Sequence, residues 1–352
     1  MDFTFTDEQR LMQSSFRELA EDLCSSAEIR AAFEGRSERA ALRWSRVAHM
    51  GLTAMLAPAQ FGGLGLDAVD FALIAQEAGR AAFPEPLSEH AGVAVPLLAQ
   101  LSCVPAAAAL LARAGGAECM IGVMHDANPF TLWPAGATHL LVCRAEEVHL
   151  ARAADVRAAP QPSVDALRRL ASIDADLGAH TLIARGAEAR GASERALERG
   201  ALFAAAESVG LAERMIQLAV DYAAARTQFG APIGSYQAIK HALASAQVRL
   251  EFARPVLYSA ASRGGETSVR GRALVSHAKI AATDAADLAG RTAMQVHGAM
   301  GYSWEVDLHF YMKRAWALAG AWGDRNFHAR RLQSLVLDGA IALGPDHTFD
   351  SP

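Results

Sequence analysis

The chain has 352 residues, 52% of them hydrophobic and 20% charged, which is enough for two or three structural units and excludes a wholly disordered chain. Lys and Arg number 33 against 38 Asp and Glu, and the net charge of −5 provides no basic surface for nucleic acid or an anionic membrane. No apolar run approaches the ~20 residues that a transmembrane helix needs, so membrane insertion is not expected.

Helical patterns fill residues 1–115, which we interpret as an N-terminal helical domain. Thr6 and Gln9 have the spacing of a capping box, in which each side chain bonds to the other residue's backbone N–H. Prolines and glycines in residues 58–65 and 84–86 divide the segment into several helices. The first helix has an apolar face at steps of three and four residues, formed by Met12, Phe16, Leu19 and Leu23.

The pattern changes over residues 116–190, which we expect to form a shortened middle β domain. Short apolar or β-branched runs between Gly, Pro, Asp and Asn residues are typical of strands. Such runs lie at residues 119–123, 138–143, 147–151 and 181–184.

Helical spacing returns over residues 191–345, which predicts a C-terminal four-helix bundle with Ala-rich packing faces. Residues 211–222 and 239–250 show the pattern first, and residues 274–294 and 308–337 continue it. Residues 346–352 are expected to be a tail. The predicted fold class is therefore mostly α with a small central β module.

Residues 226–241 read RTQFGAPIGSYQAIKH and are the most informative segment. A helix is expected to end near Arg226, and a new one to begin with Ser235 as its N-cap. Arg226 has two interpretations. Its guanidinium could bind a phosphate or carboxylate bidentately, or it could be a cation favoured at a helix C-terminus by the helix dipole.

This segment resembles the signature loop of the flavin-dependent acyl-CoA dehydrogenases. Two further segments resemble that family in the expected order: PAQFGGLGL at residues 58–66 and QVHGAMGY at residues 295–302. The resemblance covers the helical parts at both ends of the chain, and the helix, β, helix layout matches the whole of it.

The resemblance implies that FAD lies between the subunits of a homodimer, a homotetramer or a heterotetramer. Arg226 would then hold the FAD pyrophosphate across the interface, where each charge-assisted hydrogen bond contributes roughly 1.5–3 kcal/mol. Ala299 stands where the family usually has glycine, and His297 is expected to be a packed residue at a helix end. The implied cofactor-binding residues are Arg226, Gln228, Phe229, Gln237, Gln295, Gly298 and Ala299.

The family reaction is α,β-dehydrogenation of an acyl-CoA and needs a carboxylate base in a dry pocket. The base usually lies in a turn that corresponds here to residues 321–326, where Gly323 falls at the Glu position. Asp324, displaced by one residue, is the candidate base, and the catalytic residue is otherwise unknown. Counting back from the signature loop, the alternative base position holds Gly200, and nearby Glu198 is interpreted as a solvated surface residue.

The β module also lacks the family's flavin-ring motif. The sequence thus resembles the shorter chain of heterotetrameric acyl-CoA dehydrogenases for steroid or other bulky acyl-CoA thioesters, in which a second chain supplies the ring-binding loop and the base. A catalytically inactive structural paralogue is the alternative.

Further partners follow from the resemblance or from the residues. The resemblance implies an acyl thioester of CoA or of a carrier protein as substrate and an electron-transfer flavoprotein as acceptor.

The acidic start of the chain and four cysteines without a C-x-x-C pair favour a cytoplasmic protein with buried thiols. No spacing of His, Cys, Asp or Glu predicts a metal site.

Overall fold

Helices build the first part of the chain in the computed structural model, which describes residues 4–128, 130–133, 135–264, 268–339, 341 and 344. The predicted capping box of Thr6 and Gln9 is confirmed at the start of the first helix. The helices are α1 (Asp7–Leu23), α2 (Ser26–Phe33), α3 (Ala40–His49), α4 (Ala68–Arg80), the π-helix η3 (Ser88–Ala94), α5 (Val95–Gln100) and α6 (Pro105–Leu111).

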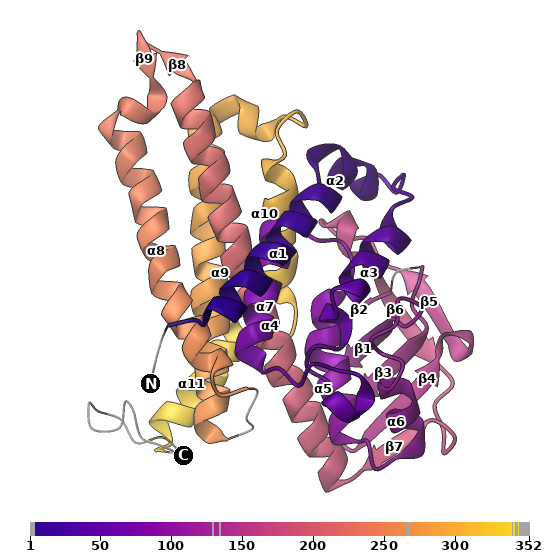
Figure 1. The fold of residues 1–352 in the computed structure, drawn as a ribbon. Coiled ribbons are helices and arrows are strands. Elements are labelled where there is room, and N and C mark those ends of the chain that lie inside the picture. The colour runs from indigo at the N-terminus through magenta and orange to yellow at the C-terminus, as the bar shows by residue number, and fades with distance from the viewer. Residues whose placement is uncertain are drawn as a thin grey trace.

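The β module follows as two sheets packed face to face (Figure 1). A four-stranded sheet has the order β1-β3-β4-β7, with β1 parallel to β3, and an antiparallel three-stranded sheet has the order β2-β6-β5. Alternation along β3 sends Leu141 into the main core and Leu140 into a smaller core between the sheets. The strands are β1 (Ile121–His125), β2 (Thr131–Leu132), β3 (His139–Cys143), β4 (Glu147–Arg152), β5 (Val156–Pro160), β6 (Leu170–Ala175) and β7 (Leu182–Arg185).

The C-terminal part is a helical bundle around α7 (Ala187–Ala225), which at 39 residues is about 58 Å long. It packs against α8 (Gln237–Ala261), α9 (Val269–His297) and α10 (Leu308–Gly320), and α11 (Arg325–Leu337) packs on α9. Small residues allow these close approaches. A Cβ added at Gly210 of α7 would overlap the carbonyl of Gln76 on α4.

The predicted fold class is confirmed: the chain is mostly helical with a small mixed β module. The four predicted strands are confirmed to within two residues, as β1, β3, β4 and β7. The strands β2, β5 and β6 were not predicted, because β2 has only two residues and β5 is rich in Ala and Pro, which strands disfavour. The predicted domain boundaries remain predictions, and the tail at 346–352 lies outside the described residues.

Three local predictions are wrong. Tyr236, not Ser235, is the N-cap of α8, because the Ser235 hydroxyl donates to the carbonyl of Pro232 in the turn before the helix. Cys103 is exposed in the turn between α5 and α6, whereas the other three thiols are buried. The helical pattern of residues 308–337 is interrupted because Trp322 and Gly323 have positive φ.

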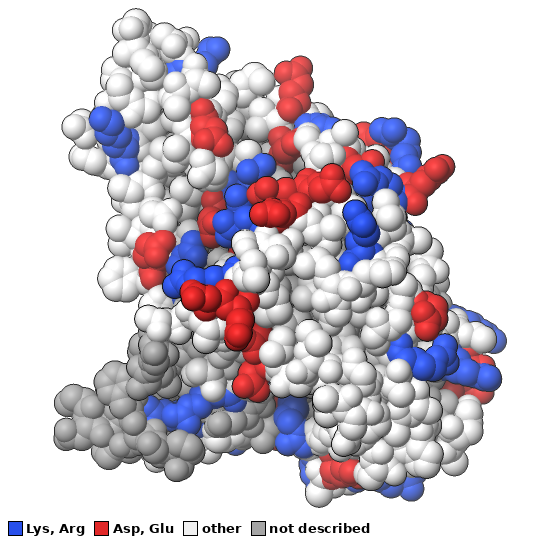
Figure 2. Space-filling model, in the orientation of Figure 1, with Lys and Arg blue, Asp and Glu red and all other residues white. Residues whose placement is uncertain are grey.

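Acidic and basic side chains are mixed over the N-terminal helices, where ion pairs such as Arg17 with Glu77 join them (Figure 2). Because opposite charges alternate over this face, it has no extended region of purely positive or purely negative electrostatic potential. Among the described residues, no helix combines the length and apolarity needed to cross a membrane.

Candidate functional site

The signature loop projects from one end of the bundle as a hairpin of β8 (Thr227–Gln228) and β9 (Ala231–Pro232) (Figure 1). Its two turn residues, Phe229 and Gly230, have φ of 52° and 80°, as a two-residue hairpin turn requires. The Tyr236 hydroxyl donates to the Gln228 carbonyl at 2.9 Å and ties the hairpin to the start of α8. The loop is therefore held by local contacts and not by burial.

The second predicted segment lies at the same end of the bundle. His297, the last residue of α9, stacks on Tyr222 of α7 with ring centroids 4.3 Å apart. Its Nδ1–H donates to the Ala293 carbonyl at 2.8 Å, which confirms the predicted packed residue at a helix end. Gly298 follows with φ of 57° and open space around its Cα. The His297–Tyr222 contact thus holds the second segment against the last turns of α7, from which the signature loop continues.

The predicted cofactor-binding residues are all exposed at this end of the bundle. Phe229 is 96% exposed, and Gln228 donates to the neighbouring Thr227 carbonyl. Within the described part of the chain, the Arg226 guanidinium has no hydrogen-bond or ion-pair partner. These side chains are therefore free to contact a ligand or a second chain. The exposed set is Arg226, Gln228, Phe229, Gln237, Gln295, Gly298 and Ala299.

Asp324, the candidate base, is exposed and forms the N-cap of α11. One of its carboxylate oxygens accepts the Phe327 backbone N–H at 2.7 Å. This contact satisfies a helix-end donor, so the carboxylate has a structural use where it lies.

Trp322 is the residue of this turn that faces α7. Its side chain is 2% exposed, and a Cβ added at Gly200 would overlap the indole ring. Trp322, which meets Gly200, is thus one position before Gly323. Gly323 is the residue that the resemblance places at the position of the family's catalytic Glu. At the alternative base position Gly200, an indole ring from the neighbouring turn therefore fills the contact instead of a carboxylate.

Several polar groups hold Trp322 in place. Its backbone N–H donates to Asn128 Oδ1 at 3.3 Å, and its carbonyl accepts from His328 Nε2 at 3.0 Å. Burial lowers the pKa of His328 to about 4, with nearby Lys279 adding to the shift, so the ring is neutral at pH 7. A neutral ring with its proton on Nε2 can accept from the Ser276 hydroxyl at Nδ1.

The interpretation of Glu198 as a solvated residue is wrong. Its side chain is fully buried and pairs with Arg331 of α11. Burial raises the pKa of this carboxyl, and Arg331 opposes the shift. Two residues turn a helix by ~200°, so Glu198 faces α11 while Gly200 faces Trp322.

Buried ion pairs lie where α7, α10 and η3 meet. Arg314 of α10 binds Asp165 and donates to the Phe83 carbonyl at 3.0 Å. Burial and the Glu89 carboxylate raise the pKa of Glu207 to about 7. The cavity among these groups measures about 20 Å³, which is room for one water. An acyl chain does not fit in a cavity of this size.

Sequence reasoning did not find the contact of Trp322 with Gly200, although one signal was available. A glycine within a run of helical alanines costs up to about 1 kcal/mol of helix stability, so its presence indicates a close approach by another group. Among the described residues, no three His, Cys, Asp or Glu side chains are grouped as a metal site requires.

Replacement of Gly200 by alanine tests this contact. We expect Gly200→Ala to lower the free energy of unfolding by about 1–3 kcal/mol, because the methyl group must displace the indole. Urea unfolding followed by circular dichroism measures the effect. The control is Gly320→Ala at the end of α10, where a Cβ meets nothing within 4 Å. The contact is refuted if both variants are equally stable, and Trp322→Leu should reduce the cost of Gly200→Ala.

The comparisons with known proteins agree with this architecture. Residues 6–102 match the family described as "Acyl-CoA dehydrogenase, N-terminal domain" and residues 190–336 match "Acyl-CoA dehydrogenase, C-terminal domain". The chain is 31% identical over 332 residues to "Acyl-CoA dehydrogenase IpdE2" of Mycolicibacterium smegmatis, covering 94% of this chain and 99% of that one.

Solved structures share the fold at lower identity. The structure titled "Tcur3481-Tcur3483 steroid ACAD G363A variant" has a TM-score of 0.80 at 22% identity and covers 95% of this chain and 99% of that one. The ChsE4-ChsE5 complex from Mycobacterium tuberculosis has a TM-score of 0.81 at 20% identity, with coverage of 96% and 99%.

Proposed function

Since the chain belongs to the acyl-CoA dehydrogenase family, we propose that it is one subunit of a heteromeric, FAD-dependent acyl-CoA dehydrogenase. It would supply cross-interface contacts to the FAD pyrophosphate, and a second chain would supply the flavin-ring loop and the base. One observation carries the proposal: within the described residues the exposed Arg226 guanidinium has no partner, while Trp322 covers Gly200 where a base would lie.

The residues at the hairpin end fit one half of an FAD site. Arg226 is a cation without a counterion in the described part of the chain, and the open backbone at Gly298 allows close approach of a ligand. Arg226 would bind the pyrophosphate, and the exposed Gln228, Phe229, Gln237 and Gln295, with Ala299, would line the same edge. FAD, when bound, supplies the acceptor for the substrate's β-hydride.

The relatives support a heteromeric assembly. Two solved structures that share the fold carry titles naming two chains, Tcur3481-Tcur3483 and ChsE4-ChsE5, and the first title calls its protein a steroid ACAD. We therefore propose a bulky acyl-CoA thioester as the substrate of the complete complex and an electron-transfer flavoprotein as its acceptor. Four unpaired cysteines fit a reducing compartment, and we propose the cytoplasm.

A catalytically inactive structural paralogue is the second candidate. The indole ring of Trp322 favours it, because an apolar side chain covers Gly200 at one of the two candidate base positions. Arg226, which has no partner among the described residues, argues against it, since a purely structural chain gains nothing from an exposed cation beside a hairpin.

Flavin stoichiometry separates the two candidates. The chain is purified alone and after co-expression with an acyl-CoA dehydrogenase chain encoded beside it, and FAD is measured by absorbance. We expect little FAD on the chain alone and about one FAD per pair of chains, bleached anaerobically by an acyl-CoA. Absence of flavin from both preparations would favour the structural paralogue. One FAD per chain without a partner would refute the half-site and make Asp324→Asn the next test.

A further inference from the structure

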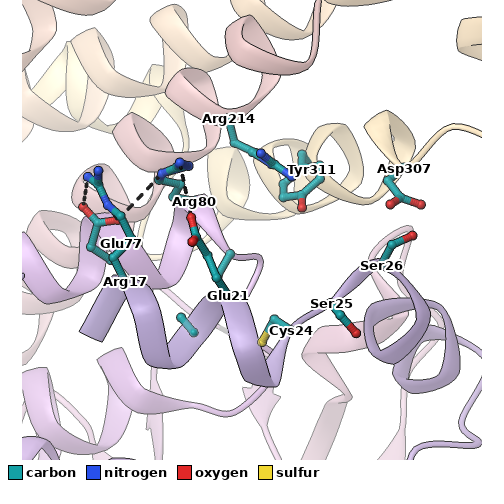
Figure 3. A pocket seen from close by; sticks show the side chains of 12 residues that line it. Arg17, Glu21, Cys24, Ser25, Ser26, Glu77, Arg80, Arg214, Asp307 and Tyr311 are labelled. Atoms are coloured by element: carbon teal, nitrogen blue, oxygen red, sulfur yellow. Dashed lines mark hydrogen bonds and ion pairs between the residues drawn. The ribbon is translucent and has the colours of Figure 1, made fainter. Parts of the chain in front are cut away.

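A cavity of about 350 Å³ opens between α1, α4, α7 and α10, beside the first turn of α2 (Figure 3). This volume lies at the lower end of small-molecule sites. On one side its charges are matched within the protein. Arg17 binds Glu77 through two hydrogen bonds of 2.7 and 2.8 Å, and Arg80 lies 3.4 Å from Glu21. This side therefore needs no counterion.

The opposite side has an unmatched cation. Arg214 lies over the Tyr311 ring at 5.7 Å from its centroid. Within the described ranges, no carboxylate lies within 4.0 Å of the Arg214 guanidinium, although other carboxylates line the same cavity. A half-buried guanidinium without a carboxylate partner has lost part of its hydration and favours an anion beside it.

Tyr311 provides a second indication of a ligand. Its hydroxyl oxygen accepts a hydrogen bond from Arg214, so the hydroxyl proton is the group left for a ligand. Its side chain is 4% exposed, and its hydroxyl points into the cavity (Figure 3). The hydroxyl proton has no acceptor in the part of the chain that the structure describes. Burial raises the pKa of this phenol, so the group is a hydrogen-bond donor at neutral pH.

The start of α2 adds further donors at the edge of the cavity. Ser25 is the N-cap of this eight-residue helix, yet its side chain makes no capping hydrogen bond. Ser25 and Ser26 line the cavity, where the first-turn N–H groups of a helix carry partial positive charge. Asp307 lines it too, but Arg30 of α2 binds that carboxylate and offsets its charge.

We propose that this cavity binds a small anion with a phosphate or carboxylate group, held by Arg214, the Tyr311 hydroxyl and the first turn of α2. The cavity is larger than one inorganic phosphate, so an organic phosphate or a small organic acid fits it. The inference does not depend on FAD binding, because none of the residues that carry it belongs to the hairpin end of the bundle.

Calorimetric titration and thermal unfolding of the full chain test the proposal with inorganic phosphate, succinate and, at matched ionic strength, sodium chloride. We expect phosphate or succinate to bind saturably and to raise Tm, and chloride to do neither. Binding of phosphate alone assigns a phosphate ligand, and binding of succinate alone a carboxylate ligand. The proposal is overturned if neither anion exceeds chloride.

Variants then assign the site. Arg214→Gln should weaken anion binding at least tenfold, and Tyr311→Phe should weaken it several-fold while keeping the buried ring. Arg46→Gln on α3 removes the same charge from an exposed position outside the cavity and should bind as the native chain does. Native affinity in Arg214→Gln, or an equal loss in Arg46→Gln, would overturn the proposal. If Arg214→Gln does not fold, Tyr311→Phe decides.

Discussion

Replacement of Arg226 by alanine in the co-expressed complex should weaken FAD binding about 10–100-fold, as the loss of one charge-assisted hydrogen bond implies. Because the native guanidinium has no partner within the described residues, the stability of the chain itself should not change. Flavin content after gel filtration and FAD titration of the apo complex measure the effect.

The matched control is Arg46→Ala, which removes another exposed arginine of the same charge, on α3. Equal FAD affinity in Arg226→Ala and the native complex would contradict the proposed role of the loop. A fall in Tm for Arg226→Ala alone would point instead to a structural role for this arginine.

Replacement of Arg314 by methionine should lower the free energy of unfolding by about 3–5 kcal/mol, because it leaves the fully buried Asp165 carboxylate without its cation. The lost hydrogen bond to the Phe83 carbonyl adds to the effect. Urea unfolding followed by circular dichroism gives the value.

Arg325→Met is the control, since Arg325 pairs with Asp284 on the exposed surface, where such pairs contribute 0–1 kcal/mol. The double variant Arg314→Met with Asp165→Leu should recover part of the stability, because no buried charge remains unpaired. A loss below about 1 kcal/mol in Arg314→Met would show that Asp165 finds another partner or water.

Much of the fold was predictable because it rests on local patterns. The apolar steps of three and four define the long helices, and the capping box at Thr6 marks the first helix start where the structure has it. The four predicted strands are those with strong apolar runs, whereas β5 pairs mainly through its backbone and has an exposed Ala-rich surface. Local composition carries no signal for a strand of that kind.

The candidate site was predictable in part for a related reason. The hairpin residues 226–237 are contiguous, so a linear motif describes them. The contact of Trp322 with Gly200 joins positions more than a hundred residues apart and depends on how a turn with positive φ directs an indole. Arg214 and Tyr311 likewise belong to different helices, and only their packing shows that Arg214 has no carboxylate partner within the residues that the structure describes.

The uninterrupted helix α7 restricts how the length of this chain can vary in evolution. Its Gly200 contacts Trp322, its Gly210 lies where α7 crosses α4, and the hairpin follows its last residue. One residue inserted between Gly210 and Arg226 would rotate the hairpin by ~100° and advance it by ~1.5 Å relative to everything packed on the earlier turns. Seven residues, close to two full turns, would nearly restore the rotational phase. Insertions and deletions in homologous chains should therefore avoid this segment or come in such steps.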